Sequence, residues 1–407
     1  MYEHQTATLS NGLRIIQIPS SSRVVYCGYA VNAGTRDELT HEQGMAHFVE
    51  HILFKGTSRR RAWHILNRME NVGGDLNAFT NKEETVVYAA FLEEHFARAF
   101  DLLTDIVFHS TFPQREIDKE VDVILDEIRS YEDSPSELIF DEFENQLFHG
   151  HPLGRNILGL PEQLKSFTTA DALAFVRRYY HPGNMVFFLK GNISLPRIVR
   201  MAEKHLADEL FCSQSSVRTP LPPYQVSRLY AHKDTHQAHV MLGCRAYSAS
   251  DEKRTGLYLL NNLLGGPGMN SRLNVSLRER RGLVYNVESN LSSYTDTGVF
   301  SIYFGTDPDD VDTCLRLVHK ELKRLRDSRL TSSQLSAAKK QLIGQIGVAS
   351  DNFENEALGM GKMFLHYNRF ETHESLFRRI ERLDAGRLLE IANELFAEEN
   401  LSSLIYR

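Results

Sequence analysis

Residues 47–51 read His-Phe-Val-Glu-His, a pentapeptide in which two histidines stand four positions apart with a glutamate between them. The surrounding sequence predicts a helix. Thr40 with Gln43 has the form of a capping box, and Gly56 follows the last apolar residues as a stop signal. Because residues three or four positions apart share one face of a helix, the three polar side chains are expected to lie together.

These three side chains suit a metal-dependent hydrolase. Neutral imidazole is a good ligand for Zn²⁺, so His47 and His51 are candidate ligands and Glu50 is a candidate general base. Apolar residues occupy much of the remaining helix circumference, where polar groups without partners would be costly. A chain with 17 histidines can also produce the pattern by chance. A catalytic zinc site needs a third protein ligand, which must come from elsewhere in the chain.

A second helix is predicted over residues 114–131, where apolar residues recur at helical spacing and Ser134-Pro135 closes the segment. Glu120 and Glu127 lie two turns apart on the border of its apolar stripe. Most carboxylates in such a helix are solvated surface charges, so spacing alone does not identify a ligand.

The pentapeptide has the inverted His-x-x-Glu-His form of the pitrilysin and insulinase superfamily of zinc peptidases. The chain resembles that family in its flanking sequences as well: Gly44-Met45-Ala46, the run from Leu53 to Thr57 and the run from Glu120 to Ile128. The resemblance implies that His47, His51 and Glu127 hold one Zn²⁺ per chain. It further implies that Glu50 is the general base and that Glu120 orients a ligand or the metal-binding helix.

Residues 73–80, Gly-Gly-Asp-Leu-Asn-Ala-Phe-Thr, alternate in a way that suits a strand. An exposed edge strand can hydrogen-bond an extended peptide, although an ordinary hairpin arm explains the pattern equally well. The segment resembles the substrate-binding edge strand of the family. This resemblance implies a substrate-binding role for Asn77, Ala78, Phe79 and Thr80.

The second half of the chain has no His-x-x-Glu-His. Its glycine-rich segment, residues 265–269, lacks the Lys-Ser/Thr of a P-loop, so nucleotide binding is not expected there. The following sequence resembles the C-terminal domain of the family, in which an Arg and a Tyr, here Arg278 and Tyr285, reach the peptide held at the zinc. Such donors can orient a carbonyl and stabilise oxyanion charge, although on spacing alone both could be surface or core residues.

The order of elements indicates an internal duplication. Residues 213–224 are polar and rich in proline, as in a linker, and a strand, a long helix, a strand pair and further helices recur on each side. In the second half the expected elements are a helix over about 252–264 and strands near Val287 and Phe300. We therefore expect an α+β protein of two homologous α/β-roll domains, each a mixed, largely antiparallel sheet with helices packed on it.

The predicted domains are residues 1–212, which hold the zinc site, and residues 225–407, which lack one and contribute the Arg and Tyr. The resemblance implies that the two domains form half of a clamshell around a chamber. Because larger relatives build the full shell from four such domains, a partner is expected. A homodimer is the first choice, and a heterodimer with a metal-free homologous subunit stays open.

Composition excludes some classes of function. A formal net charge of −7 argues against nucleic-acid binding, which requires concentrated Lys and Arg. Four scattered cysteines show neither a zinc spacing nor a disulfide framework. No apolar run resembles a secretory signal or could span a bilayer, so a cytoplasmic protein without membrane association is expected if the chain is the unprocessed product.

The expected function is that of a zinc-dependent endopeptidase that hydrolyses short or unfolded peptides inside a closed chamber. The alternative is a non-catalytic scaffold or partner subunit of a peptidase-like heteromeric complex. Such subunits usually lack parts of the zinc motif, and the presence of His47, Glu50, His51 and Glu127 favours the enzyme.

Overall fold

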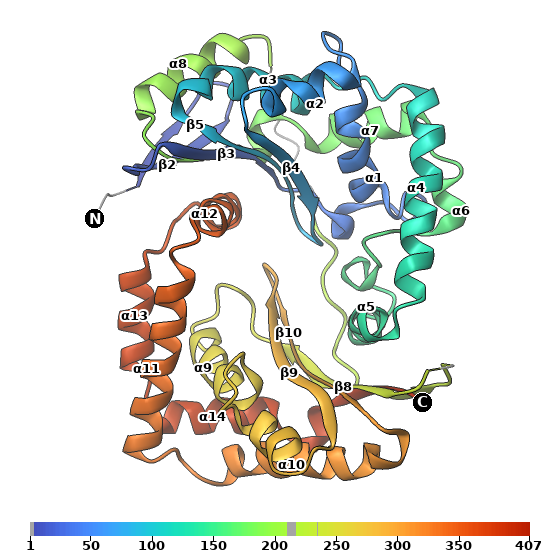
Figure 1. Cartoon of the computed structure of the whole chain (residues 1–407), viewed down its shortest axis with the longest axis vertical. Helices are drawn as coiled ribbons and strands as arrows, with labels where there is room; N and C mark the ends of the chain where they lie inside the picture. Colours follow the sequence, from blue (N-terminus) through green and yellow to red (C-terminus); the bar gives the residue numbers. More distant parts are fainter. Residues whose placement is uncertain (1–3, 210–216, 234) are drawn as a thin grey trace. The chain divides into compact units, whose positions relative to one another are not determined.

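The computed structural model describes residues 4–209, 217–233 and 235–407, and the chain divides into two compact units (Figure 1). Unit 1 comprises Met1–Arg129, Arg155–Pro220 and Ser350–Phe370. Unit 2 comprises Ser130–Gly154, Leu221–Ala349 and Glu371–Arg407. Each unit contains one sheet and the helices packed on it.

The sheet of unit 1 has six strands in the order β1-β2-β6-β3-β5-β4. Only β2 and β6 run parallel, and the other neighbouring pairs are antiparallel. The central strand β3 reads Val-Val-Tyr-Cys-Gly-Tyr-Ala-Val, a nearly continuous apolar run that suits a strand covered on both faces. The strands are β1 Gln5–Thr8, β2 Arg14–Ile18, β3 Val24–Val31, β4 Asp75–Thr80, β5 Thr85–Leu92 and β6 Met185–Lys190.

The sheet of unit 2 has five strands in the order β7-β11-β8-β10-β9. Its one parallel pair is β7 with β11, and the other pairs are antiparallel. This order repeats β2-β6-β3-β5-β4 of unit 1, with the parallel pair in the same place. The repeat confirms the predicted fold class of two similar α/β units with mixed, largely antiparallel sheets. The strands are β7 Arg228–Ala231, β8 Ala238–Ala246, β9 Val284–Ser293, β10 Gly298–Thr306 and β11 Ser402–Tyr406.

Helices of each half cover one face of its own sheet and enclose the larger hydrophobic core of that unit. In the first half they are α1 Met45–Ile52, α2 Ala62–Glu70, α3 Phe96–His109, α4 Gln114–Glu132, α6 Pro161–Leu164, α7 Thr169–Tyr179 and α8 Leu195–His205. In the second half they are α9 Arg254–Gly265, α10 Val311–Asp327, α11 Ser332–Ala349, α13 His373–Arg382 and α14 Ala385–Leu395, with a π-helical segment at Asn274–Glu279.

The opposite face of each sheet is covered by a helix that comes from the other half of the chain. Helix α12, Phe353–Tyr367, packs on β6 and β3 of unit 1, where Met360 and Phe364 join Phe188 in a separate apolar cluster. A Cβ at Gly361 would lie 2.6 Å from the Phe188 ring, so the close approach of α12 to β6 requires glycine there. Helix α5, Pro135–Leu147, packs in the same way on β8 and β11 of unit 2.

This exchange makes both units discontinuous, so they differ from the predicted ranges 1–212 and 225–407 although each sheet stays within its predicted half. Of the predicted linker, residues 213–216 lie outside the described part of the chain. The described remainder is anchored at Arg218, whose guanidinium donates to both carboxylate oxygens of Asp37 at 2.9 and 3.0 Å and to Glu83 at 2.9 Å. Both carboxylates are buried, and a paired, buried arginine fixes the chain locally.

The start of α1 corrects a prediction. The helix begins at Met45, and Thr40 does not cap it, because Gly44 occupies the N-cap position with a φ of 95°. The buried carboxylate of Glu38 replaces the capping box by accepting the backbone N–H groups of Gly44 at 3.0 Å and Ala46 at 2.9 Å. The predicted stop at Gly56 agrees with the structure, where a 3₁₀ turn, Leu53–Lys55, follows α1 and ends at this glycine.

Glu84, just before β5, ties α12 to unit 1. Its buried carboxylate contacts Lys362 Nζ at 2.7 Å and His366 Nε2 at 3.0 Å. Burial acts to raise the pKa of Glu84, but the hydrogen bond from His366 and the charge of Lys362 outweigh it and lower the pKa to about 2. The charged carboxylate is therefore the form that the folded unit favours.

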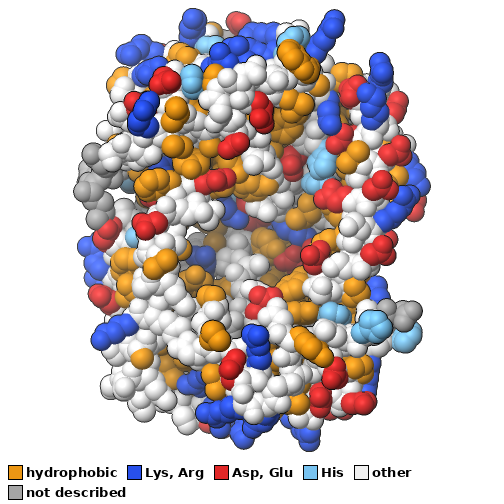
Figure 2. Space-filling model, in the orientation of Figure 1, with side chains coloured by type: hydrophobic (Ala, Val, Ile, Leu, Met, Phe, Trp, Pro, Cys, Tyr) orange, Lys and Arg blue, Asp and Glu red, His pale blue; other side chains and the backbone are white. Residues whose placement is uncertain are grey.

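Charged side chains of both signs are scattered over the face shown in Figure 2, among hydrophobic and uncharged ones, and several basic side chains lie along its lower edge, where α10 lies in Figure 1. None of the helices in the described part of the chain combines the length and apolar character needed to cross a membrane.

Glu38→Gln is expected to lower the free energy of unfolding by about 1–3 kcal/mol, because an amide offers one oxygen acceptor and turns an NH₂ group towards the second backbone N–H. The measurement is urea unfolding in the presence of a chelator, so that metal binding does not contribute. The control is Glu94→Gln, which alters an exposed pair with Arg23 and should change stability by less than about 0.5 kcal/mol. Equal losses in both variants would contradict the capping role.

Glu84→Gln tests the pH dependence of stability. Because the folded-state pKa is depressed, the contribution of Glu84 is fully present above the unfolded value near 4.5 and is lost as pH falls towards about 2. The difference in unfolding free energy between wild type and variant should therefore be about 2 kcal/mol smaller at pH 3 than at pH 6. The exposed Glu203→Gln serves as control. A pH-independent difference would show that the Glu84 charge is not coupled to folding.

Candidate metal centre and active site

Helix α1 separates apolar from polar side chains around its axis. Met45, Phe48, Val49 and Ile52 are fully buried in the core of unit 1. The Phe48 ring meets the Phe167 ring at a centroid distance of 5.3 Å in an edge-to-face arrangement. Because the apolar side is anchored in this way, the three polar residues of the pentapeptide turn to the opposite side of the helix.

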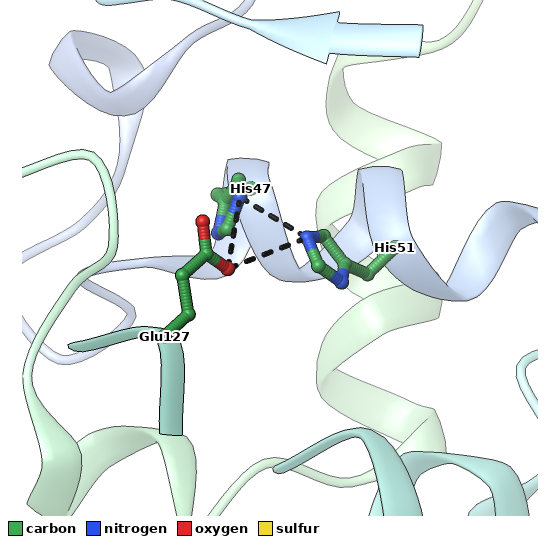
Figure 3. Close-up of side chains that lie close together, drawn as sticks. All are labelled: His47, His51 and Glu127. Carbon is green, nitrogen blue, oxygen red and sulfur yellow. Dashed lines mark hydrogen bonds and ion pairs between the residues drawn. The ribbon is translucent and has the colours of Figure 1, made fainter. Parts of the chain in front are cut away.

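The structure brings His47, His51 and Glu127 together, as predicted (Figure 3). The two imidazole Nε2 atoms are 3.2 Å apart. Glu127 Oε2, on α4, lies 4.0 Å from His47 Nε2 and 3.8 Å from His51 Nε2. Among the described residues, this is the one group of three or more His, Cys, Asp or Glu side chains close enough to share an ion.

These separations fit a divalent metal. With bonds of ~2.0–2.2 Å, two ligand atoms of a tetrahedral zinc site are about 3.3–3.6 Å apart, and the measured distances of 3.2, 3.8 and 4.0 Å bracket that range. Two nitrogens and one carboxylate oxygen are also a donor set that leaves one position of a tetrahedron open. The residues present therefore fit a catalytic rather than a closed structural metal site.

Glu120 orients one of the imidazoles. Its buried carboxylate lies 3.0 Å from His51 Nδ1 and 2.7 Å from Lys55 Nζ. When neutral His51 donates its Nδ1 proton to Glu120, its Nε2 lone pair faces His47 and Glu127, which is the form that binds a metal. Burial alone would raise the pKa of Glu120, but the hydrogen bonds from His51 and Lys55 lower it.

The two histidines differ in their affinity for a proton. Burial and the neighbouring His51 lower the pKa of His47 to about 3. Burial acts to lower the pKa of His51 too, but the hydrogen bond to Glu120 and the charges of Glu50 and Glu127 raise it above its usual value. A proton on this pair is therefore favoured on His51 over His47, whose buried Nδ1 has no hydrogen-bond partner among the described residues.

Glu50, on α1, lies beside this group and next to Thr80, the last residue of strand β4. Burial raises its pKa, while a hydrogen bond from Thr80 and the charge of His51 act in the opposite direction. The same Thr80 hydroxyl lies 3.5 Å from the backbone oxygen of Ala46 and can share its one proton with it, so β4 and α1 are close together next to the carboxylate. A carboxylate with a raised pKa is suited to accept a proton near neutral pH.

Strand β4 is the last strand of its sheet and pairs only with β5 among the described residues. Asn77 is exposed, Ala78 and Phe79 are half-buried, and Thr80 is buried. The Phe79 ring packs against Tyr88 at a centroid distance of 6.3 Å. The strand is both an arm of the β4–β5 hairpin and the edge of its sheet, so the sequence was right to suggest either, and its open edge next to Glu50 can accept an extended peptide.

Arg278 and Tyr285 belong to unit 2. Arg278 lies at the end of the π-helical segment, is exposed and lines a cavity of about 440 Å³ together with residues of α9 and β9. Tyr285, in β9, is 61% exposed and donates from its hydroxyl to Asp307 Oδ1 at 3.4 Å. Both side chains are accessible, and their proposed contact with a peptide stays a prediction.

Helix α9 is the counterpart of α1. Along the chain α1 lies between β3 and β4 and α9 between β8 and β9, which hold matching places in the two sheets, and each helix packs against the edge strand that follows it. Tyr258, Asn261 and Asn262 follow one another on α9 with the i, i+3, i+4 spacing of His47, Glu50 and His51. A phenol and two amides are poor zinc ligands compared with imidazole and carboxylate. Helix α9 therefore offers no counterpart of the metal-binding side chains at this spacing.

Sequence reasoning missed two residues of the site. Lys55 stands four positions after His51, so helical spacing could have placed it on the same face beside Glu120. Glu38 carries no local signal, because it caps α1 from six positions before Gly44 through a fold of the intervening chain.

Comparison with known proteins agrees with this geometry. Residues 14–160 match the family model described as insulinase, peptidase family M16, and residues 166–342 match the model described as the peptidase M16 inactive domain. An uncharacterized zinc protease of Bacillus subtilis is 33% identical over 98% of this chain and 97% of its own length. Another, from Rickettsia felis, is 31% identical over 98% and 96%.

Solved structures show the same fold. A protease from Helicobacter pylori superimposes with a TM-score of 0.92 at 21% identity and covers 100% of both chains. A putative M16-like peptidase from Alicyclobacillus acidocaldarius gives 0.88 at 21% identity, over 100% of this chain and 98% of that one. With the pentapeptide, the third carboxylate and these similarities in place, the chain belongs to the insulinase family of peptidases, peptidase family M16.

Proposed function

We propose that the protein is a zinc-dependent endopeptidase that hydrolyses short or unfolded peptides. One observation carries the proposal: two imidazole nitrogens and a carboxylate oxygen lie within 4.0 Å of one another, with Glu50 on the same helix face and the open edge of β4 alongside. The relatives from Bacillus subtilis and Rickettsia felis, which are called zinc proteases, support the choice of metal.

His47, His51 and Glu127 would hold the ion. When bound there, zinc supplies Lewis-acid chemistry, polarising a carbonyl and making water a stronger acid. Glu50 accepts the proton of the attacking water and passes it to the leaving amine, a role for which its raised pKa suits it. Glu120 holds His51 in the metal-binding tautomer.

The substrate backbone would lie along residues 77–80. Hydrogen bonds to the free edge of β4 bind any extended peptide regardless of its sequence, which favours short or unfolded chains over folded proteins. Arg278 and Tyr285 would complete the site by orienting the carbonyl and stabilising developing negative charge. Their exposure leaves both side chains available for this contact.

A closed chamber needs a partner in this proposal, and a homodimer is the simplest one. The same chain carries the metal-binding residues and the Arg278 and Tyr285 pair, so two copies supply every part. A heterodimer with a metal-free homologous subunit is the alternative assembly.

A second candidate function is that of a non-catalytic subunit. The name of the family model that matches residues 166–342, the peptidase M16 inactive domain, favours it. The three residues of the candidate metal site, His47, His51 and Glu127, lie with Glu50 in the segment that matches the insulinase model, which favours the enzyme.

Glu50→Gln separates these functions. The variant is expected to retain stoichiometric zinc while cleavage of a quenched peptide library falls by about 10²- to 10⁴-fold, because the proton acceptor is lost and the ligands remain. Metal content by mass spectrometry and initial cleavage rates are the measurements. Glu70→Gln, an exposed change on α2, should leave both unchanged.

Two further outcomes would contradict the proposal. A wild-type protein that binds zinc but cleaves no peptide would support the non-catalytic subunit. Full activity in Glu50→Gln would remove Glu50 from the mechanism.

Glu127→Gln should reduce both zinc content and cleavage, whereas the exposed neighbouring change Asp126→Asn should reduce neither.

Glu120→Ala is expected to weaken zinc binding by about 10- to 100-fold, because His51 Nδ1 and Lys55 lose their shared acceptor. Competition with a chromogenic chelator measures the zinc dissociation constant. Urea unfolding of the metal-free variant is measured in parallel, since a purely structural role would change the unfolding free energy without changing zinc affinity in the folded state.

A further inference from the structure

Unit 2 contains a cavity of about 470 Å³ that the proposed peptidase chemistry does not use. It lies between the C-terminal part of α10, the start of α11 and the chain around the π-helical segment. Its volume falls within the range of small-molecule binding pockets. The basic side chains along the lower edge of Figure 2 lie in the region of α10.

The charged lining of this cavity is strongly basic. Arg272, Arg280, Arg324 and Arg329 line it, against a single carboxylate, Glu321. The contrast with the whole chain, whose formal net charge is −7, shows that the basic character is local.

The one carboxylate is already paired. Glu321 is 5% exposed and accepts from Arg324 at 2.6 Å, a charge-assisted hydrogen bond. Among the described residues, no carboxylate lies within ion-pair distance of Arg272, Arg280 or Arg329. Arg272, Arg280 and Arg329 therefore line the cavity without a carboxylate in ion-pair contact, while the charges of Glu321 and Asp384 act at longer range on Arg272 and Arg329, respectively.

Arg272 is the most enclosed of these three. Its side chain is half-buried, and burial lowers the pKa of its guanidinium, with Glu321 acting against this and Arg324 adding to it. The charge of Glu321 only partly offsets the burial of this cation, and an anion in the cavity would offset more of it.

We propose that this cavity binds a compact polyanion that carries at least two phosphate groups. Guanidinium forks match phosphate oxygens in pairs, and three unpaired arginines balance about the charge of a pyrophosphate rather than that of a single phosphate. The Ser276 hydroxyl, also in the lining, is a further donor. The glycine-rich segment at 265–269 plays no part in this recognition.

Titration calorimetry of the zinc-loaded protein with inorganic pyrophosphate tests the proposal. We expect one site per chain and an affinity at least 10-fold higher for pyrophosphate than for orthophosphate. Arg272→Gln combined with Arg280→Gln should weaken pyrophosphate binding at least 10-fold. The matched control, Arg316→Gln with Lys320→Gln, removes the same charge from exposed positions of α10 outside the cavity and should change affinity by less than two-fold.

Each other result overturns the proposal. Equal weakening in both double variants indicates general charge attraction, and undiminished binding in the cavity variant places pyrophosphate elsewhere, including at the metal. Equal affinities for the two anions remove the requirement for two phosphates. Urea unfolding without ligand checks that the Arg272→Gln and Arg280→Gln double variant is folded. Loss of these charges should leave the free energy of unfolding unchanged or increase it. A decrease would indicate that the two arginines have a structural role instead.

Discussion

The buried carboxylate of Glu38 holds the beginning of α1, and the candidate site depends on that contact. An eight-residue helix is too short to be stable by itself in water, so its position must come from its surroundings. Apolar packing of residues such as Phe48 fixes its rotation, and the two hydrogen bonds to Glu38 fix its start. The two hydrogen bonds act to lower the pKa of Glu38, but burial outweighs them and raises it to about 8. Burial of a charged carboxylate at this position is therefore costly.

The metal centre combines one local and one distant contribution. His47 and His51 converge because they are four positions apart on α1, whereas Glu127 and Glu120 arrive together from α4. Because Glu127 and Glu120 are two turns apart on α4, one packed helix supplies both the third donor and the group that orients His51. The approach of a second helix therefore converts a histidine pair into a site suited to a divalent metal.

The two halves of the chain share an architecture, but among the described residues only the first holds a candidate metal site. Both sheets have the same strand order, and each is covered on its second face by a helix from the opposite half, α12 or α5. Interchange of these helices ties the two halves of the chain into both units. On α9, Tyr258, Asn261 and Asn262 have the same i, i+3, i+4 spacing as the polar residues of the pentapeptide, but they are not zinc ligands of the same kind.

Local periodicity determined much of what could be predicted from sequence. The helix expected over 114–131 is α4, Gln114–Glu132, and that expected over about 252–264 is α9, Arg254–Gly265. The i, i+3, i+4 spacing likewise placed the polar face of α1. Such patterns are readable because they reflect the geometry of a single element. The choice of Glu127 required more than periodicity, since an exposed helical glutamate carries no local mark of a ligand.

Only the tertiary structure decided the contacts between distant segments. The cap on α1 comes from Glu38 rather than from Thr40, Arg218 anchors the end of the linker on Asp37 and Glu83, and α12 and α5 cover the sheet of the other half. Each of these contacts forms in a buried environment that many parts of the unit build together. A charge without a partner is costly there, so the contact depends on where the folded chain places the partner. The sequence by itself determined the elements and the chemistry of their faces, while packing decided which faces meet.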